Sequence, residues 1–279
     1  MQAHIFQIFY SDESRSLLDP RFIPLDNTAN EHPDWREYWP IRKFLLDAAL
    51  CDDDYYGFLS PRFREKTGLS SEQVFEFVKP GHDVISFSPF PDLRSWYCNV
   101  FEQAELIHPG LTDLGQRFVN AVAFPAELRN IVMDSRQMIF ANYFLAKPRF
   151  WTAWFQLAEK LFHIAESGTG PLAESLNAPV AYYVRGAAPA KVFIMERLAS
   201  LLISTQGWTV SAYNPSLLPF SDLRLDNVAF ELIVLDALKL AYNGTGYAHY
   251  VDAFRKLREL VASKLEYPTL RATVGARPM

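Results

Sequence analysis

The stretch Asp53-Asp54-Tyr55-Tyr56-Gly57-Phe58-Leu59-Ser60-Pro61-Arg62-Phe63 consists of an acidic turn, a short apolar run and an abrupt polar stop. The apolar run, 55–59, is too short for a helix of ordinary length and is flanked by turn-forming residues, which is typical of a buried strand. Ser60, Arg62 and Lys66 follow it. Because open α/β sheets bind ligands outside the carboxyl ends of their strands, these side chains are candidates for binding an anion such as a phosphate. The alternative is a solvated basic loop after a strand.

The composition limits the class of protein. The chain has 279 residues, 49% of them apolar, which suits one large α/β domain or one domain with a helical appendage. Its 27 basic and 32 acidic residues give a formal net charge of −5, so we expect no nucleic-acid partner. There is no run of about 18 apolar residues and no secretory signal, which predicts a cytoplasmic protein. Cys51 and Cys98 are interpreted as reduced thiols.

Strand and helix patterns alternate along the first part of the chain. The expected elements are a strand over 4–10, a loop over 11–34, a helix over 35–50, a strand over 55–59, a helix from Ser70 to Val78 and a strand over 83–87. This order indicates an α/β fold whose central sheet is mostly parallel, Rossmann-like and flanked by helices.

The second part of the chain is mainly helical. We expect helices over 95–130 with a break at 108–110, strand and turn over 131–146, helices over 148–166 and 191–205, and helical segments over 225–242 and 247–265. Aromatic residues along the helix from Pro148 are expected in the core, although an acceptor platform or a membrane-facing surface would use the same stripe. The predicted organisation is a domain over 1–205, a helical C-terminal extension over 206–269 packed on it, and a mobile tail over 270–279.

Two charged residues, Glu196 and Arg197, lie in the middle of the apolar helix expected over 191–205. Neighbouring helical residues point about 100° apart, so they cannot share one buried face without partners. An unpaired buried charge would cost on the order of several kcal/mol. One interpretation is a structural ion pair. The other is that Glu196 faces a site as a general base while Arg197 orients it or holds a phosphate.

Loops and element ends supply six further candidate binding residues: Asp26, Asn27, Glu37, His108, Asn142 and Lys147. The first two lie in the long loop after the first strand, where an α/β fold would bind a base or a sugar, and Glu37 follows in the next helix. Asn142 and Lys147 belong to a polar patch around strand-like segments, and His108 could contact a phosphate or a sugar hydroxyl. Each also has a structural interpretation, because Asp and Asn favour turns and a loop His is often structural.

A metal site is not favoured. Asp52-Asp53-Asp54 contains an Asp-x-Asp pair, which could hold Mn²⁺ or Mg²⁺ against a diphosphate. The pair precedes the strand, whereas a metal-binding pair should follow it, so a solvated turn is favoured and no metal cofactor is expected to be required. The chain also lacks G-x-G-x-x-G, G-x-x-x-x-G-K-[ST], G-x-S-x-G and H-E-x-x-H motifs, which disfavours hydrolase and zinc-enzyme functions.

Several segments in a fixed order resemble a known family. They are Asp34-Trp35-Arg36-Glu37-Tyr38-Trp39 at a helix start, Tyr55 to Phe63, Asn99 to Leu114, Asn142 to Lys147, and Lys191 to Leu198. Together they are similar to bacterial polysaccharide glycosyltransferases with a GT-A-like fold, encoded with capsule, exopolysaccharide and O-antigen genes. The resemblance spans roughly residues 4–205, and it is supported by the order in which these segments follow one another along the chain. The chain departs from the family by lacking the His and paired Arg near Arg62 and the Gly before Glu196.

The resemblance implies transfer of a sugar from a nucleotide-sugar donor to an envelope polysaccharide or a lipid-linked glycan. Departure of the nucleoside diphosphate needs a metal or positive side chains, and Arg62 with Lys66 would replace the metal. Glu196 would deprotonate the acceptor in an inverting reaction. Contact with the inner face of the cytoplasmic membrane or with other polysaccharide-assembly enzymes is compatible with this role. The alternative function is a non-catalytic nucleotide- or sugar-binding module of a larger synthase.

Overall fold

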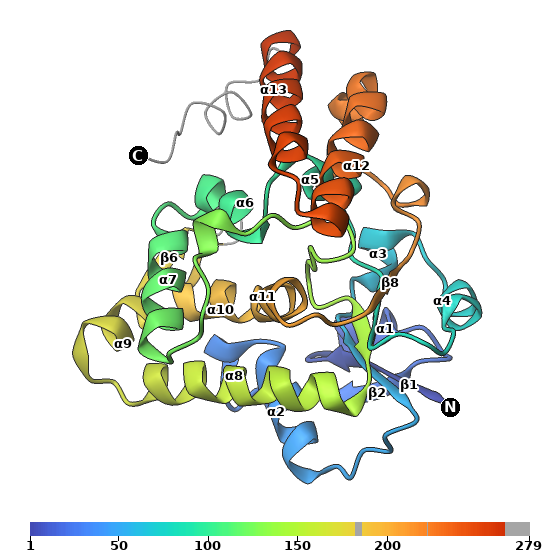
Figure 1. Ribbon diagram of the computed structural model, residues 1–279. Coiled ribbons are helices and arrows are strands. Elements are labelled where there is room, and N and C mark those ends of the chain that lie inside the picture. The colour runs from blue at the N-terminus through green and yellow to red at the C-terminus, as the bar shows by residue number, and fades with distance from the viewer. Residues whose placement is uncertain (182–185, 222, 266–279) are drawn as a thin grey trace.

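A computed structural model describes residues 1–181, 186–221 and 223–265 (Figure 1). The first elements are β1 (Ala3–Phe9), α1 (Asp12–Ser16), β2 (Ile23–Asp26), the 3₁₀ turn η1 (Pro33–Trp35), α2 (Tyr38–Asp47), β3 (Tyr55–Leu59), α3 (Phe63–Thr67), α4 (Ser71–Phe77), β4 (Val84–Ser86), α5 (Pro91–Trp96), α6 (Val100–Ile107) and α7 (Leu111–Ala121). The later ones are η2 (Leu128–Asn130), β5 (Phe144–Ala146), α8 (Pro148–Glu166), α9 (Gly170–Asn177), β6 (Pro179–Ala181), β7 (Ala187–Pro189), α10 (Ala190–Met195), α11 (Leu198–Thr205), β8 (Val210–Ala212), η4 (Pro215–Leu217), η5 (Leu223–Val228), α12 (Ala229–Thr245) and α13 (Ala248–Lys264).

The central sheet has six strands in the order β2-β1-β3-β5-β4-β8. Strands β1, β2 and β3 are parallel to one another, and so are β4 and β8, whereas β5 is antiparallel to both of its neighbours. The prediction of a mixed α/β fold with a mostly parallel sheet and flanking helices is therefore confirmed. Of the strand and turn expected over 131–146, the structure has turns at 135–137 and 141–142 and a single strand, β5; the positive φ of Ala141 and Asn142 interrupts the extended chain just before it.

The loop expected over 11–34 is wrong in part, because it contains α1 and the edge strand β2. Ser11 and Ser14 form a capping box that stabilises α1, but this helix of 5 residues is too short to show a hydrophobic period. The helix expected over 35–50 begins at Tyr38, and Pro40 lies in its first turn, where its missing N–H costs nothing.

The single helix expected over 191–205 is wrong, because the chain breaks into α10 and α11 with Glu196 and Arg197 between them. The Arg197 guanidinium donates to the Phe193 carbonyl at 2.7 Å, which satisfies the group that an unbroken helix would use. The Arg197 backbone N–H instead bonds to the carbonyl of Ile194 at 3.0 Å, which tightens the last turn.

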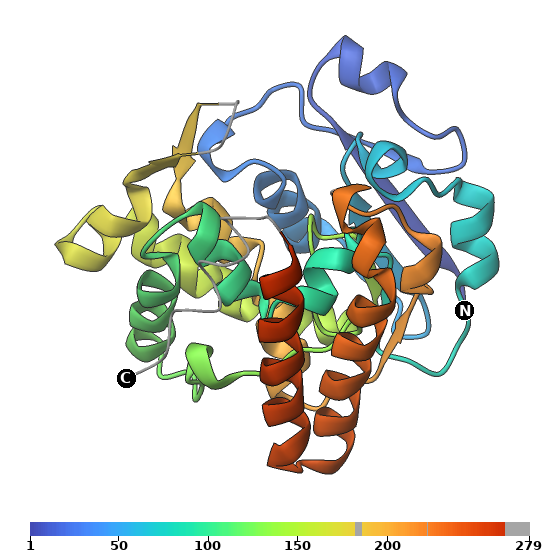
Figure 2. The same cartoon turned by 90° about the horizontal axis from the view of Figure 1, so that it is seen from above.

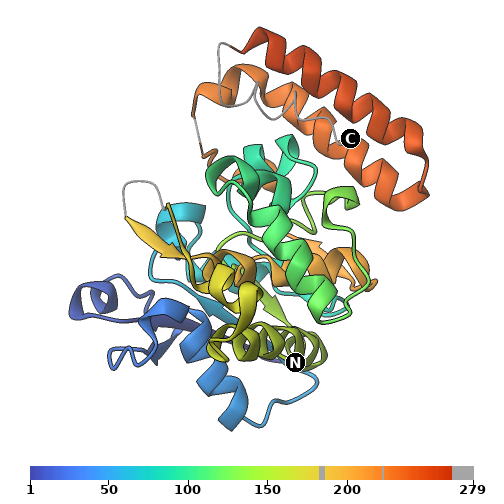
Figure 3. The same ribbon diagram turned by 90° about the vertical axis from the view of Figure 1, so that its left-hand side faces the viewer.

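The C-terminal part completes the sheet and then forms a helical hairpin. Residues 210–212, within the extension expected over 206–269, form β8 and pair with β4. Helices α12 and α13 lie side by side and stand away from the sheet (Figures 2 and 3). Lys239 of α12 is buried and donates to the Tyr97 carbonyl at 2.8 Å, which ties the hairpin to the end of α5. The tail expected over 270–279 lies outside the described residues.

Apolar side chains cover both faces of the sheet. On one face, Tyr56 and Phe58 of β3 pack in the larger core with α2 and the aromatic residues of α8. On the other face, Tyr55 and Leu59 pack with side chains of α3 and α4. The expectation that the aromatic residues from Pro148 onward lie in the core is confirmed, because Phe150, Trp151 and Trp154 are all buried. Within the described ranges, no helix combines the length and the apolarity that crossing a membrane would require.

Gly57 is the position in β3 where the sheet packs most closely. A Cβ built there would lie 2.7 Å from Leu145 Cδ2 and 3.0 Å from the Phe144 carbonyl oxygen. We expect Gly57→Ala to reduce the free energy of unfolding by about 1–3 kcal/mol, because the neighbouring strand must move. Urea denaturation measures the change. Gly244→Ala is the matched control: its Cβ would meet nothing within 4 Å, so alanine should stabilise α12 by up to about 1 kcal/mol.

Candidate functional site

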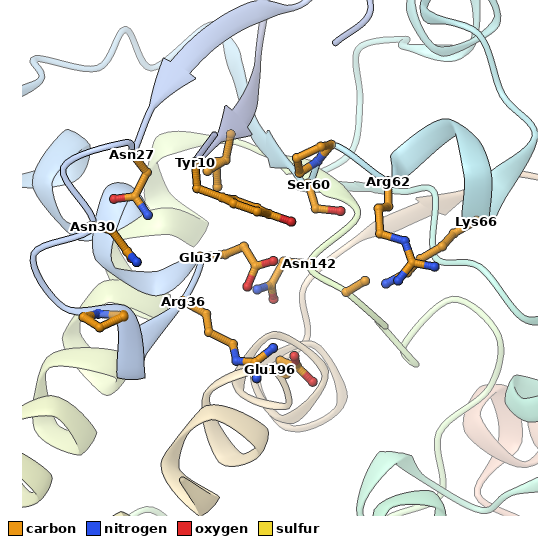
Figure 4. A pocket seen from close by; sticks show the side chains of 14 residues that line it. Tyr10, Asn27, Asn30, Arg36, Glu37, Ser60, Arg62, Lys66, Asn142 and Glu196 are labelled. Atoms are coloured by element: carbon orange, nitrogen blue, oxygen red, sulfur yellow. The ribbon is translucent and has the colours of Figure 1, made fainter. Parts of the chain in front are cut away.

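A cavity of about 330 Å³ opens at the carboxyl edge of the sheet (Figure 4). Tyr10, Asn27 and Ser60, which directly follow β1, β2 and β3, all line it. The chain leaves β1 to form β2 on one side and later forms β3 on the other, so the cavity lies where the strand order reverses, the usual ligand site of open α/β sheets. Its complete lining is Ile8, Tyr10, Asn27, Asn30, Pro33, Arg36, Glu37, Ser60, Pro61, Arg62, Lys66, Ala141, Asn142 and Glu196.

The cavity carries charges of both signs. Arg62, at the N-cap of α3, and Lys66, in its last turn, approach from one side, while Arg36 and Glu196 lie together across the opening (Figure 4). Arg62 is held by Glu65, whose carboxylate accepts from Nε at 2.6 Å, and its side chain remains 32% exposed. Glu37 lies beside Asn142, above Arg36 in this view (Figure 4). Such a site offers cations to an anionic ligand and carboxylates to hydroxyl groups of the same ligand or of a second one.

Buried polar groups fix the segment after β3. Gln7 of β1 donates from Nε2 to the carbonyls of Ser60 at 3.2 Å and of Pro61 at 3.4 Å. Its Oε1 accepts the Asp19 backbone N–H at 2.8 Å, so this one side chain links three segments. The Ser60 hydroxyl shares a hydrogen bond of 2.5 Å with Tyr143, and burial raises the pKa of the Tyr143 phenol. Ser60 is thereby held in place at the cavity.

Strained backbone is concentrated at the cavity. The left-handed region of φ is occupied there by Asn30 (43°), Arg36 (48°), Ala141 (57°) and Asn142 (56°). Asn tolerates this region, but Arg36 and Ala141 do not favour it. Such residues cost roughly 1–3 kcal/mol each and gather where function requires a particular side-chain direction. The backbone therefore marks this cavity independently of its charges.

A buried lysine fixes one wall of the cavity to the other. Lys191 of α10 is 1% exposed, and its Nζ donates to Asp34 Oδ2 at 2.5 Å and to Glu166 Oε1 at 3.2 Å. Glu166 also accepts from Trp35 Nε1 at 2.7 Å. Asp34 and Trp35 belong to the turn that carries Arg36 and Glu37, while α10 leads into Glu196. The Lys191 ion pairs thus hold the two walls at a fixed distance.

Glu196 lies at the α10–α11 break and faces the cavity. Its side chain is 36% exposed, and its Oε2 is 3.9 Å from Arg197 Nη1. Burial raises the pKa of the Glu196 carboxyl, and the negative charge of Glu37 raises it further. The positive charges of Arg197, Lys66 and Arg36 act in the opposite direction and lower this pKa. A carboxyl with a raised pKa in a cavity is typical of a group that accepts a proton.

Seven of the residues predicted from the sequence line this one cavity: Asn27, Glu37, Ser60, Arg62, Lys66, Asn142 and Glu196. Arg197 instead points into the protein, where it donates to the Val100 carbonyl at 3.0 Å and to Gln103 at 3.2 Å. Of the lining residues, it approaches Glu196, at 3.9 Å. The expectation that Arg197 holds a phosphate directly does not fit this position.

His108, Asp26 and Lys147 lie elsewhere. His108 is buried after α6, with its ring centroid 3.9 Å from that of Phe193. Asp26 accepts the Thr28 backbone N–H at 2.7 Å and so shapes the turn that presents Asn27. Lys147 lies at the opposite edge of the sheet, because β5 runs antiparallel and carries it there from Asn142.

The acidic turn before β3 also lies at that opposite edge. Asp54 accepts the Gln2 backbone N–H at 2.6 Å and lies 3.1 Å from His4 Nε2. Lys147 donates to the Asp53 carbonyl at 2.5 Å. The Asp-x-Asp pair is therefore separated from Arg62 by the length of β3, as its place before the strand predicts.

The sequence interpretation missed Tyr10, Asn30 and Arg36 as lining residues, and Gln7 as their support. Gln7 had a signal, since it is the polar residue within the apolar first strand. Tyr10 also had one, because it follows that strand at its carboxyl end. No sequence signal marked Arg36, since the direction of its side chain depends on a backbone conformation that glycine adopts more readily than arginine.

Comparison of the chain with protein-family models, with curated proteins and with solved structures found no match.

The Lys191 ion pairs predict a stability effect. We expect Lys191→Met to lower the free energy of unfolding by roughly 1–3 kcal/mol, because Asp34 and Glu166 lose their partner while they remain partly solvated. Chemical denaturation monitored by tryptophan fluorescence measures this. Lys43→Met is the control, because Lys43 pairs with Glu31 at the surface with a 52% exposed side chain, and its loss should cost less than about 1 kcal/mol. Equal effects of the two substitutions would contradict the structural role assigned to Lys191.

Proposed function

We propose that the protein is a GT-A-like glycosyltransferase that moves a sugar from a nucleotide-sugar donor to a bacterial envelope polysaccharide or a lipid-linked glycan. One observation carries the proposal: a cavity at the point where the strand order reverses, with Arg62 and Lys66 on one side and Glu196 on the other. The mixed sheet, in which antiparallel β5 lies between parallel strands, is compatible with a GT-A-like arrangement.

The donor's diphosphate would bind Arg62 and Lys66. In the reaction the bond between the anomeric carbon and the diphosphate oxygen breaks, and negative charge grows on that leaving oxygen. Two cations at fixed positions stabilise this charge, and Ser60 can donate a further hydrogen bond. Tyr10, Asn27 and Asn30, on the β1 and β2 side of the cavity, are available to the base and the ribose.

The acceptor's hydroxyl would approach Glu196. The carboxylate takes the hydroxyl proton as the acceptor oxygen forms its bond to the anomeric carbon on the face opposite the leaving diphosphate. This direct displacement inverts the configuration. Burial raises the pKa of the Glu196 carboxyl, and a carboxylate with a raised pKa is a stronger base toward the acceptor hydroxyl.

Nucleotide binding is the first expected outcome. One of UDP, GDP, CDP, TDP and CMP should raise the melting temperature, because a ligand that binds only the folded state stabilises it, by about 2.7 kcal/mol at 100 times its dissociation constant. A thermal-shift screen with and without Mn²⁺ measures this. Stabilisation without Mn²⁺ supports a donor site built on Arg62. A requirement for Mn²⁺ would contradict the assignment of this cation as the replacement for a metal.

Substitutions separate donor binding from chemistry. Arg62→Ala should weaken nucleotide binding about 10- to 100-fold, through the loss of a charge-assisted contact. Arg64→Ala is its control, since Arg64 is an exposed residue of the same helix outside the lining. Glu196→Gln should lower kcat about 10²- to 10⁴-fold with nucleotide affinity nearly unchanged. Isothermal titration and a donor-turnover assay measure the two effects.

Two results would overturn the catalytic proposal. Unchanged donor turnover in Glu196→Gln would remove the proposed base. Tight nucleotide binding by the wild-type protein, with no turnover on any glycan acceptor, would instead identify a non-catalytic nucleotide-binding module.

A further inference from the structure

Arg36 reaches the cavity through an unusual backbone conformation. Its φ of 48° and ψ of −128° lie in a region that glycine favours and that other residues seldom adopt. Trp35 before it is 1% exposed in the core, and the backbone reversal after this residue turns the next side chain outward. The Arg36 side chain extends toward Glu196 (Figure 4). A flexible surface arginine would not need this conformation.

The turn that carries Arg36 is attached to the helix that leads to Glu196. Asp34, two residues before Arg36, accepts from Lys191, which lies five residues before Glu196 on α10. The contact is 2.5 Å long, and the Lys191 side chain is only 2% exposed. This contact holds the turn that carries Arg36 against the helix that leads to Glu196.

We propose that Arg36 is a positioning residue, whose guanidinium keeps the Glu196 carboxylate ionised and turned into the cavity. The inference rests on the proposed function, in which Glu196 is the general base. Arg36 is not required to touch the nucleotide in this role. It acts on the reaction only through the state of Glu196.

Four charged groups act on Glu196, and they differ in sign. Arg197, Lys66 and Arg36 favour the carboxylate and lower its pKa, whereas Glu37 disfavours it and raises its pKa. Burial raises the pKa more strongly than any of them. Removal of Arg36 should therefore raise the pKa of Glu196 further, and removal of the Glu37 charge should lower it.

The test is a direct titration of Glu196, independent of turnover. Protein with ¹³C-labelled glutamate carboxyl groups is titrated by NMR, and the signal lost in Glu196→Gln identifies Glu196. Arg36→Gln should move its midpoint upward by roughly 0.5–1 pH unit, and Glu37→Gln should move it downward. Arg36→Gly should act like Arg36→Gln, and it should fold at least as well because glycine suits this backbone. Arg36→Lys should restore most of the wild-type midpoint.

Arg255→Gln is the matched control, since Arg255 lies exposed on α13 and pairs with Asp252; it should leave the midpoint unchanged. An unchanged midpoint in folded Arg36→Gly or Arg36→Gln would overturn the proposal, and so would an equal change in Arg255→Gln. Where turnover is measurable, the pH midpoint on the acid side of the kcat/KM profile should move to higher pH in Arg36→Gln, while the KM for the donor stays unchanged. If the wild-type protein transfers no sugar, the proposed function fails, and the titration still decides the role of Arg36.

Discussion

Strand β3 is buried on both faces, and the rest of the structure follows from that constraint. All of its residues are buried, and alternate side chains enter the two apolar cores. Helices must therefore cover both sides of the sheet, and Gly57 lets β5 pack closely beside the strand. A strand enclosed in this way meets solvent only at its ends. The polar groups after Leu59 gather at one such end, together with those that follow the parallel strands β1 and β2.

Local patterns in the sequence predict much of this fold. The apolar runs of β1 and β3, the Ser70–Gln73 capping box of α4 and the aromatic stripe of α8 depend on residues close together in the chain. The direction of β5 could not be predicted in this way, because it depends on which strands flank it. At the break between α10 and α11, the Arg197 side chain bonds to the Phe193 carbonyl in place of the backbone N–H that an unbroken helix would use.

The candidate site shows the same division. Ser60, which directly follows a predicted strand, and Asn27, in the loop expected after the first strand, could be placed from the sequence, since parallel strands end at a common edge. Lys147 was predicted as a binding residue too, but the reversed direction of β5 carries it to the other edge. Lys191 and Asp34 lie 157 residues apart, and nothing local in either segment indicates that they form an ion pair. Long-range polar contacts of this kind set the shape of the cavity.

Strand β8 has a consequence for any shortened form of the chain. It covers the free edge of β4 with residues 210–212, which come after all the lining residues of the cavity. A fragment that ends at Thr205 would keep the whole cavity lining, but the edge of β4 that faces away from β5 would lose its partner strand, and β4 contains the apolar Val84 and Ile85. Exposed edges of this type recruit strands from other molecules. Such a fragment would be prone to aggregation, so the C-terminal segment protects the site's scaffold from self-association.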